Sequence, residues 1–137
     1  YGSGTVLDIG SADVNGNYRD VVESAGHKYI GADIQDGPNV DIVIKDGCTL
    51  PDCDTMISGQ VLEHVEQPWT WLQRSSSSLR SGGHAIVIAP WSWRLHEHPV
   101  DCWRVFPDGM RGLFDWAGLT VVESGMLKFD TWCVGEK

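Results

Sequence analysis

The stretch VLDIGSADVNGNYRD, residues 6–20, decides the fold. An apolar run over residues 5–10 predicts a buried strand, with Asp8 near its end and Gly10 in the turn that follows. Residues 17–26 predict a helix that stops at Gly26 and carries apolar side chains on one face, namely Tyr18, Val21, Val22 and Ala25. A strand, a glycine turn and a helix in this order are typical of one unit of a parallel sheet.

The same alternation continues to the end of the chain. Further strands are predicted over residues 27–34, 40–46, 53–59 and 84–90, and a final pair over 119–127 and 128–136 that joins near Gly125. One helix is predicted from Pro68 to a stop at Gly82 and Gly83, and another over residues 107–117. Residues 91–106 show no regular pattern.

Strands that alternate with helices imply right-handed crossovers. We therefore expect an α/β fold: a Rossmann-like, doubly wound, mostly parallel seven-stranded sheet with helices on both faces and an antiparallel final strand. The QDGPN connection between the second and third strands is too short for a helix, so this is a minimal version of the fold.

Ligands of such sheets bind at the carboxyl ends of the strands, beside the first strand. Asp8, Gly10, Asp33, Asp46 and residues 58–60 all fall at these predicted ends. Gly10 allows close approach of a ligand to the backbone. A carboxylate at Asp33 can accept the hydroxyls of a ribose, and one at Asp46 can accept the amine of adenine. Together these positions predict a site for an adenosine-containing molecule.

Length, charge and cysteine content limit the domain count and the kinds of ligand that the chain can bind. The chain has 137 residues, 42% of them hydrophobic, which suits a single domain over residues 1–137. The formal net charge is −9, and its excess lies in residues 1–68, with twelve acidic and three basic side chains. This charge repels nucleic acid and suits a cationic ligand. No run predicts a membrane span or export signal, and the four cysteines form no CxxC pair, so a cytoplasmic protein with free thiols is expected.

The order of the motifs resembles that of class I S-adenosylmethionine-dependent methyltransferases, and most closely the type 11-like subgroup that acts on small molecules or sugars. The motifs that carry this resemblance are VLDIGSADVNG, YIGADIQDGPNVDIVIKDGCTLP, DTMISGQVLEHV, GGHAIVIAPW and HPVDCWRVFPDGMRGLFDWAGL. The resemblance covers nearly the whole chain. It departs from the common DxGxGxG pattern at Ala12, which stands in place of the second glycine.

The resemblance implies S-adenosyl-L-methionine as the cofactor and methyl transfer to a small-molecule acceptor, such as a sugar or glycan precursor, as the activity. Its cofactor-binding positions correspond to Asp8, Gly10 and Ser11 for the methionine part, Asp33 and Ile34 for the ribose side, Asp46 and Gly47 for the adenine side, and Gln60 in the donor pocket.

Transfer to a hydroxyl requires a base, whereas an acceptor that is already nucleophilic requires none. His64 and His98 are the predicted catalytic residues, since histidine exchanges protons near neutral pH. The segment WSWRLHEHPVDCWRVF (91–106) follows the fifth strand and offers candidate substrate-binding residues, namely Trp93, His96, Asp101 and Arg104. Asp101 can instead pair with Arg104. His96 and His98 have no evident third ligand, so no metal is expected.

Two other functions stay open at this point. A nicotinamide-dependent oxidoreductase also has an acid after the second strand, but its GxGxxG pattern fails at Ala12 and Asn15. A non-catalytic cofactor-binding or regulatory module on the same fold is the other alternative. Seven tryptophans in so short a chain are compatible with a homo-oligomeric interface as well as with core packing.

Overall fold

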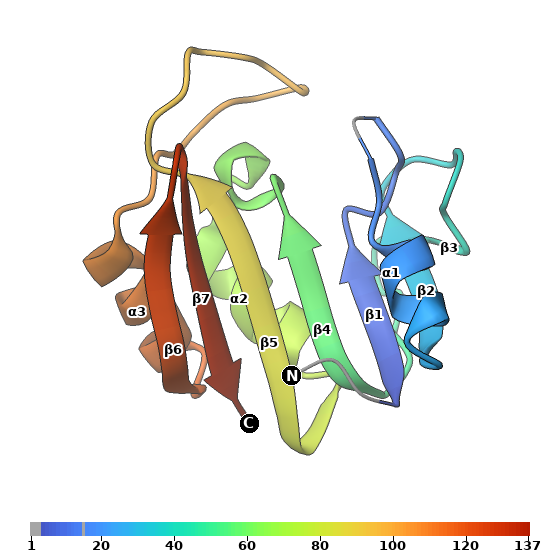
Figure 1. Ribbon diagram of the computed structural model, residues 1–137. Coiled ribbons are helices and arrows are strands. Elements are labelled where there is room, and N and C mark those ends of the chain that lie inside the picture. Colours follow the sequence, from blue (N-terminus) through green and yellow to red (C-terminus); the bar gives the residue numbers. More distant parts are fainter. Residues whose placement is uncertain (1–3, 15) are drawn as a thin grey trace.

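The computed structural model describes residues 4–14 and 16–137. Asn15, one of the two positions at which the nicotinamide pattern fails, lies outside them. The described chain forms one seven-stranded sheet in the order β3-β2-β1-β4-β5-β7-β6 (Figure 1). Its elements are β1 (Thr5–Ile9), α1 (Arg19–Ser24), β2 (Lys28–Asp33), β3 (Ile42–Val43), β4 (Cys53–Gly59), the 3₁₀ helix η1 (Leu62–His64), α2 (Pro68–Ser76), β5 (Leu79–Pro90), α3 (Pro107–Trp116), β6 (Thr120–Leu127) and β7 (Asp130–Glu136).

The sheet has the predicted topology. β1 lies inside the sheet and pairs in parallel with β2 and β4, β4 pairs in parallel with β5, and only β7 runs antiparallel to the other strands. The carboxyl ends of the parallel strands therefore meet at one edge, the top of Figure 1, where segment 91–106 also rises. The Rossmann-like, mostly parallel fold is confirmed, and so is the connection from β2 to β3 without a helix.

Helices are distributed unevenly over the two faces. α2 and α3 pack together behind the sheet as drawn in Figure 1, and the buried Met110 and Phe114 of α3 join the core there. α1 lies on the opposite face beside β2. The predicted cover on both faces is therefore only partly right, because among the described residues no helix lies in front of β5, β6 and β7. Within the same residues, no helix is long and apolar enough to cross a membrane.

The apolar face predicted for α1 is wrong. None of the helix residues is buried, and Val21 is 72% exposed. The helix is short, at 6 residues, it packs beside β2, and polar contacts hold it there. Arg19 supplies most of these contacts.

Two predicted boundaries are wrong because the glycines taken as stop and turn signals lie inside strands, where a neighbouring group leaves no room for a Cβ. α2 ends at Ser76, and Gly82 and Gly83 lie inside β5, where a Cβ on Gly83 would come within 2.8 Å of the Asp54 carbonyl oxygen. Gly125 lies inside β6 rather than at the turn, because the Trp132 ring on β7 leaves only 2.9 Å for a Cβ. The hairpin turns instead at residues 128 and 129, between the paired Leu127 and Asp130.

Candidate functional site

The loop after β1, residues 10–13, is shaped by Gly10. Its φ of +85° is unfavourable for other residues, and an added Cβ would lie 2.1 Å from Cγ2 of Val61. The backbone N–H groups of Gly10 and Ser11 both donate to the Ala32 carbonyl on β2, at 2.8 and 3.2 Å. The loop is thus fixed between the ends of β2 and β4.

Asp33 ends β2 beside this loop. Its carboxylate accepts the backbone N–H of Ala12 at 3.1 Å and that of Gln35 at 3.0 Å. A carboxylate has about four acceptor positions, so positions remain for the hydroxyls of a ligand. Ile34 follows with its side chain 66% exposed, which leaves an apolar surface next to the acid.

Asp8 is buried, with only 2% of its surface exposed. Its carboxylate accepts a hydrogen bond from the Tyr29 hydroxyl. Burial raises the pKa of Asp8 from 3.8 to about 6, the Tyr29 hydrogen bond lowers it in part, and the Asp33 carboxylate raises it further. Asp8 is therefore a buried acid beneath the loop, and its carboxylate is not exposed on the loop's surface.

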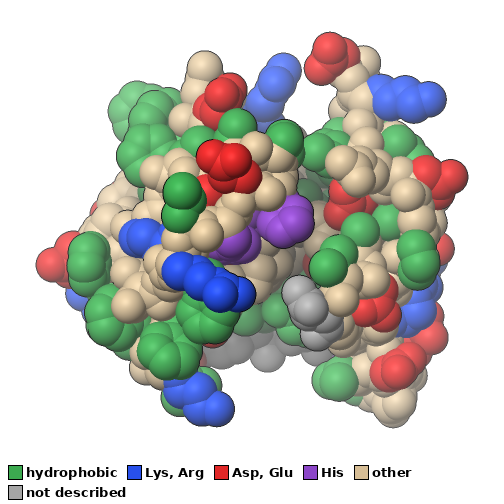
Figure 2. Space-filling view, turned by 90° about the horizontal axis from the view of Figure 1, so that it is seen from above, with side chains coloured by type: hydrophobic (Ala, Val, Ile, Leu, Met, Phe, Trp, Pro, Cys, Tyr) green, Lys and Arg blue, Asp and Glu red, His purple; other side chains and the backbone are tan. Residues whose placement is uncertain are grey.

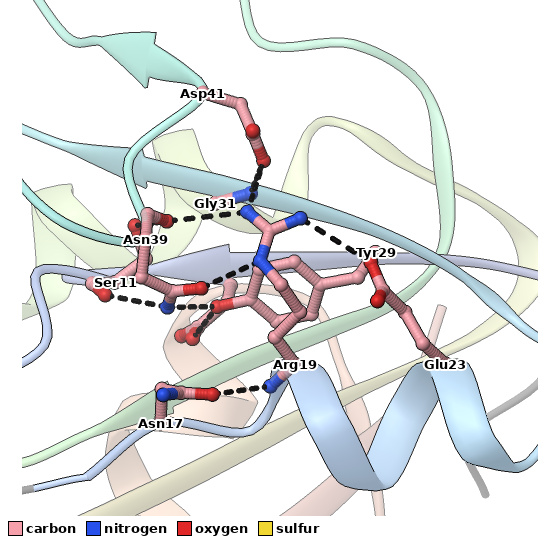
Figure 3. Close-up of polar contacts among 9 residues, drawn as sticks. Ser11, Asn17, Arg19, Glu23, Tyr29, Gly31, Asn39 and Asp41 are labelled. Atoms are coloured by element: carbon pink, nitrogen blue, oxygen red, sulfur yellow. Dashed lines mark hydrogen bonds and ion pairs between the residues drawn. The ribbon is translucent and has the colours of Figure 1, made fainter.

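A polar network ties the loop to β2 (Figure 3). Arg19 lies over the Tyr29 ring at 4.3 Å and donates to the side chains of Asn39 and Asp41, both at 2.7 Å. Asn39 donates to the carbonyl of Ser11 and to the Tyr29 hydroxyl, and it accepts the Ser11 hydroxyl on its own carbonyl. The Ser11 side chain, expected to bind a cofactor, is thus used within the protein.

Sequence reasoning missed this network. In the sequence Arg19, Asn39 and Asp41 look like ordinary helix and turn residues. They come together only in the folded chain. A weak signal is Asn39 itself, since asparagine tolerates the left-handed backbone found there at φ +71°.

The remaining cofactor candidates lie at two other strand ends. Asp46 and Gly47 form an exposed turn beyond β3. Gln60, just after β4, has a φ of +58° and its side-chain amide donates to Asp130 at 2.9 Å. Tyr18, which was predicted only as part of a helix face, places its hydroxyl over Gly59 at the same strand end, where an added Cβ would lie 2.3 Å from the hydroxyl oxygen.

Segment 91–106 brings histidines next to η1. The His64 ring centroid lies 4.9 Å from that of His96 and 5.9 Å from that of His98. Figure 2 shows the histidines at the centre of this edge of the molecule, beside the hollow between its two halves. The predicted catalytic residues, His64 and His98, are therefore close together, and His96 lies with them.

Glu63 completes this group and was not predicted. Its side chain is fully buried, and ligating atoms of Glu63, His64 and His96 all lie within 4.8 Å of one another. Burial raises the pKa of Glu63. The sequence offered no third ligand for the pair 96 and 98. The structure groups Glu63 and His64 with His96 instead.

Asp101 and Arg104, expected to bind substrate, bind each other. Arg104 makes two hydrogen bonds to the Asp101 carboxylate, at 2.6 and 2.7 Å, and three more to the carbonyls of Trp93, Arg94 and Trp103. These five bonds use all five guanidinium donors. The pairing also holds the pKa of Asp101 well below its usual range. Both residues therefore organise segment 91–106, and neither has a free group for a ligand.

Trp93, another predicted substrate-binding residue, is not used in such a pairing. Its side chain is 51% exposed and packs edge-on against Phe129 at a centroid distance of 5.5 Å. The β6–β7 turn thus holds an aromatic face of Trp93 exposed.

No family model and no curated protein matches the sequence, whereas many solved structures match the fold. One is the 1,6-didemethyltoxoflavin-N1-methyltransferase of Burkholderia thailandensis with bound S-adenosylhomocysteine, at TM-score 0.79 and 18% identity over 97% of this chain and 70% of that one. Another is an S-adenosylmethionine-dependent methyltransferase of Mesorhizobium loti, at TM-score 0.75 and 12% identity over 100% and 93%.

A third is the magnesium protoporphyrin IX methyltransferase of Synechocystis PCC 6803, at TM-score 0.74 and 14% identity over 96% of this chain and 73% of that one. At these identities the likeness is one of fold. The chain therefore has the fold of the class I S-adenosylmethionine-dependent methyltransferases.

Proposed function

We propose that this protein transfers a methyl group from S-adenosyl-L-methionine to a small-molecule acceptor. The observation that carries the proposal is the pairing of the Gly10 loop with the Asp33 carboxylate at adjacent strand ends. This is where sheets of this kind bind nucleotide-like ligands. The three neighbours described above are all methyltransferases, which supports the reaction class.

The donor side follows from the strand ends. Asp33 would accept the ribose hydroxyls, Ile34 would pack against the adenine ring, and Asp46 with Gly47 would border it. The backbone of residues 10–12 would face the methionine part. The donor supplies an activated methyl group on a cationic sulfur. The acidic excess of residues 1–68 and the buried Asp8 favour a cation at this edge.

The acceptor side is formed by segment 91–106. Trp93 offers an exposed aromatic face, which suits a sugar or another ring-bearing molecule. His98 is exposed beside His64 and would take the proton of an acceptor hydroxyl. His64 is a poorer base, because its Nδ1 lies 2.6 Å from the Val100 carbonyl oxygen and its other side faces Glu63. Its contribution is to position the histidine group.

Calorimetric titration with S-adenosylmethionine and S-adenosylhomocysteine tests the proposal. Wild type and Asp36→Asn, an exposed control on the same connection, should bind both compounds, whereas Asp33→Asn should bind them at least about tenfold more weakly, since charge-assisted hydrogen bonds are the strong ones. Binding of NAD in their place would indicate an oxidoreductase. No binding to either sulfur compound would overturn the proposal.

Turnover is tested separately. A panel of hydroxylated rings and sugars, with methyl transfer followed by the release of S-adenosylhomocysteine, should yield at least one acceptor. Tight cofactor binding without transfer to any acceptor would favour the non-catalytic module.

A further inference from the structure

We propose that Glu63, His64 and His96 form a binding site for a divalent transition-metal ion. Their ligating atoms all lie within 4.8 Å of one another. Two imidazoles and one carboxylate are a common donor set for zinc, iron, manganese and cobalt in proteins. This replaces the sequence-based expectation that no metal binds.

The strongest support for this metal site is the buried carboxylate of Glu63. Its side chain has no exposed surface, and within the described residues neither carboxylate oxygen has a hydrogen-bond partner. The nearest cationic candidate, Nε2 of His64, is 3.7 Å from Oε1, beyond hydrogen-bond distance. Buried carboxylates are normally paired or coordinate a metal. A bound cation would satisfy both oxygens at once.

The backbone around Glu63 shows that its burial is built into the fold. Its carbonyl accepts the N–H groups of Cys102 and Trp103, at 2.7 and 3.3 Å. These bonds tie η1 to segment 91–106. They bring the two parts of the chain that carry the proposed ligands to one place.

His64 is prepared to act as a ligand. Its Nδ1 lies 2.6 Å from the Val100 carbonyl oxygen, which can only accept, so Nδ1 carries the proton. In the neutral ring Nε2 keeps its lone pair, and it is the ring atom beside Glu63. Metal-binding histidines usually donate their other N–H in this way.

His96 has a similar support. Its Nδ1 lies 3.3 Å from the Asp101 carboxylate and 3.3 Å from the Arg94 carbonyl oxygen. Its backbone N–H also donates to Asp101 at 2.7 Å. Asp101 is fixed in turn by Arg104, so the ring is held from two sides. Support of the His96 ring therefore gives Asp101 and Arg104 a role, although neither has a free group for a substrate.

Three protein ligands leave coordination positions open for water or a substrate atom. If the proposed methyl transfer is correct, an acceptor oxygen could occupy one of them and lose its proton more readily. The site itself does not depend on that reaction.

The test uses the untagged full chain, stripped of metal with a chelator. Titration with Co²⁺, followed by its visible absorption, should show a single ion per chain in a nitrogen and oxygen environment, and calorimetry with Zn²⁺ should show the same stoichiometry. Mg²⁺ should bind much more weakly, since it prefers oxygen ligands.

Glu63→Gln and His96→Ala should each weaken Co²⁺ binding by at least about 100-fold, since loss of a supporting partner alone costs about 10- to 100-fold. His27→Ala, at the opposite edge of the sheet, and Cys102→Ser, beside the site, should leave it unchanged. Far-ultraviolet circular dichroism of the stripped proteins checks that each variant folds.

Absence of Co²⁺ and Zn²⁺ binding by wild type would overturn the proposal, as would equal binding by folded Glu63→Gln and His96→Ala. Both measurements are made without donor or acceptor. Metal binding with no affinity for S-adenosylmethionine would therefore leave the site standing and refute only the proposed function.

Discussion

Replacement of Asp8 by asparagine should stabilise the protein at neutral pH. The Tyr29 hydroxyl can still donate to the amide oxygen, and the buried charge is removed. The pKa of Asp8 is raised from 3.8 to about 6, mainly by burial. Since each factor of ten in an equilibrium constant is about 1.4 kcal/mol, ionised Asp8 costs up to about 3 kcal/mol of stability at pH 7.

The sign of the pH dependence follows from the raised pKa. The folded protein holds the Asp8 proton more tightly than the unfolded chain, so this group favours folding below about pH 4 and that contribution is lost as pH rises through about 6. The free energy of unfolding of Asp8→Asn, relative to wild type, should therefore increase between pH 4 and 6 and stay constant above.

Urea denaturation at several pH values measures this difference. Asp36→Asn, an exposed acid on the surface, is the matched control and should follow wild type throughout. If Asp8→Asn is no more stable than wild type at pH 7.5, or if the difference does not change with pH, the reasoning about the buried charge is refuted. The same variant should bind S-adenosylmethionine more weakly, because the cation loses a nearby negative charge.

Three further substitutions test other parts of the structure. Gly10→Ala should lower the free energy of unfolding, measured by urea denaturation, by about 1–3 kcal/mol, because of the positive φ and the clash with Val61. Gly37→Ala, which has open space around it, should be neutral, and equal effects of the two substitutions would contradict this reasoning. Arg104→Lys loses the five-bond arrangement and should speed chymotryptic cleavage within residues 91–106, while Arg94→Lys should not; unchanged cleavage would argue against its organising role. His98→Gln should lower kcat by about 100-fold or more with unchanged cofactor affinity, and an unaltered rate would remove His98 as the base.

Much of the sheet could be predicted because its signals are local. Apolar runs bounded by turn residues gave β1, β2 and β4 closely, and the position of Asp33 at a strand end followed from them. Errors arose where a glycine is required by a neighbour distant in sequence. Gly83 accommodates the Asp54 carbonyl and Gly125 accommodates Trp132, and neither contact can be inferred from the glycine's surroundings in the chain.

The candidate site was harder to predict for the same reason. His64 and His96 could be listed as chemically suitable, but their meeting depends on how segment 91–106 folds back over η1. Glu63 looks like a surface acid on a short helix, yet it is fully buried. The choice between substrate binding and mutual pairing for Asp101 and Arg104 likewise depends on geometry.

The contact between Gly10 and Val61 has a consequence for anyone who wishes to redesign this protein. Val61 immediately precedes η1, so the loop at the donor side rests directly on the segment that carries Glu63 and His64. A larger residue at position 10 would push this segment and, with it, the histidine group. Loop exchange between related proteins should therefore transfer residues 8–13 and 59–65 as one module, since neither half can be optimised while the other is held constant.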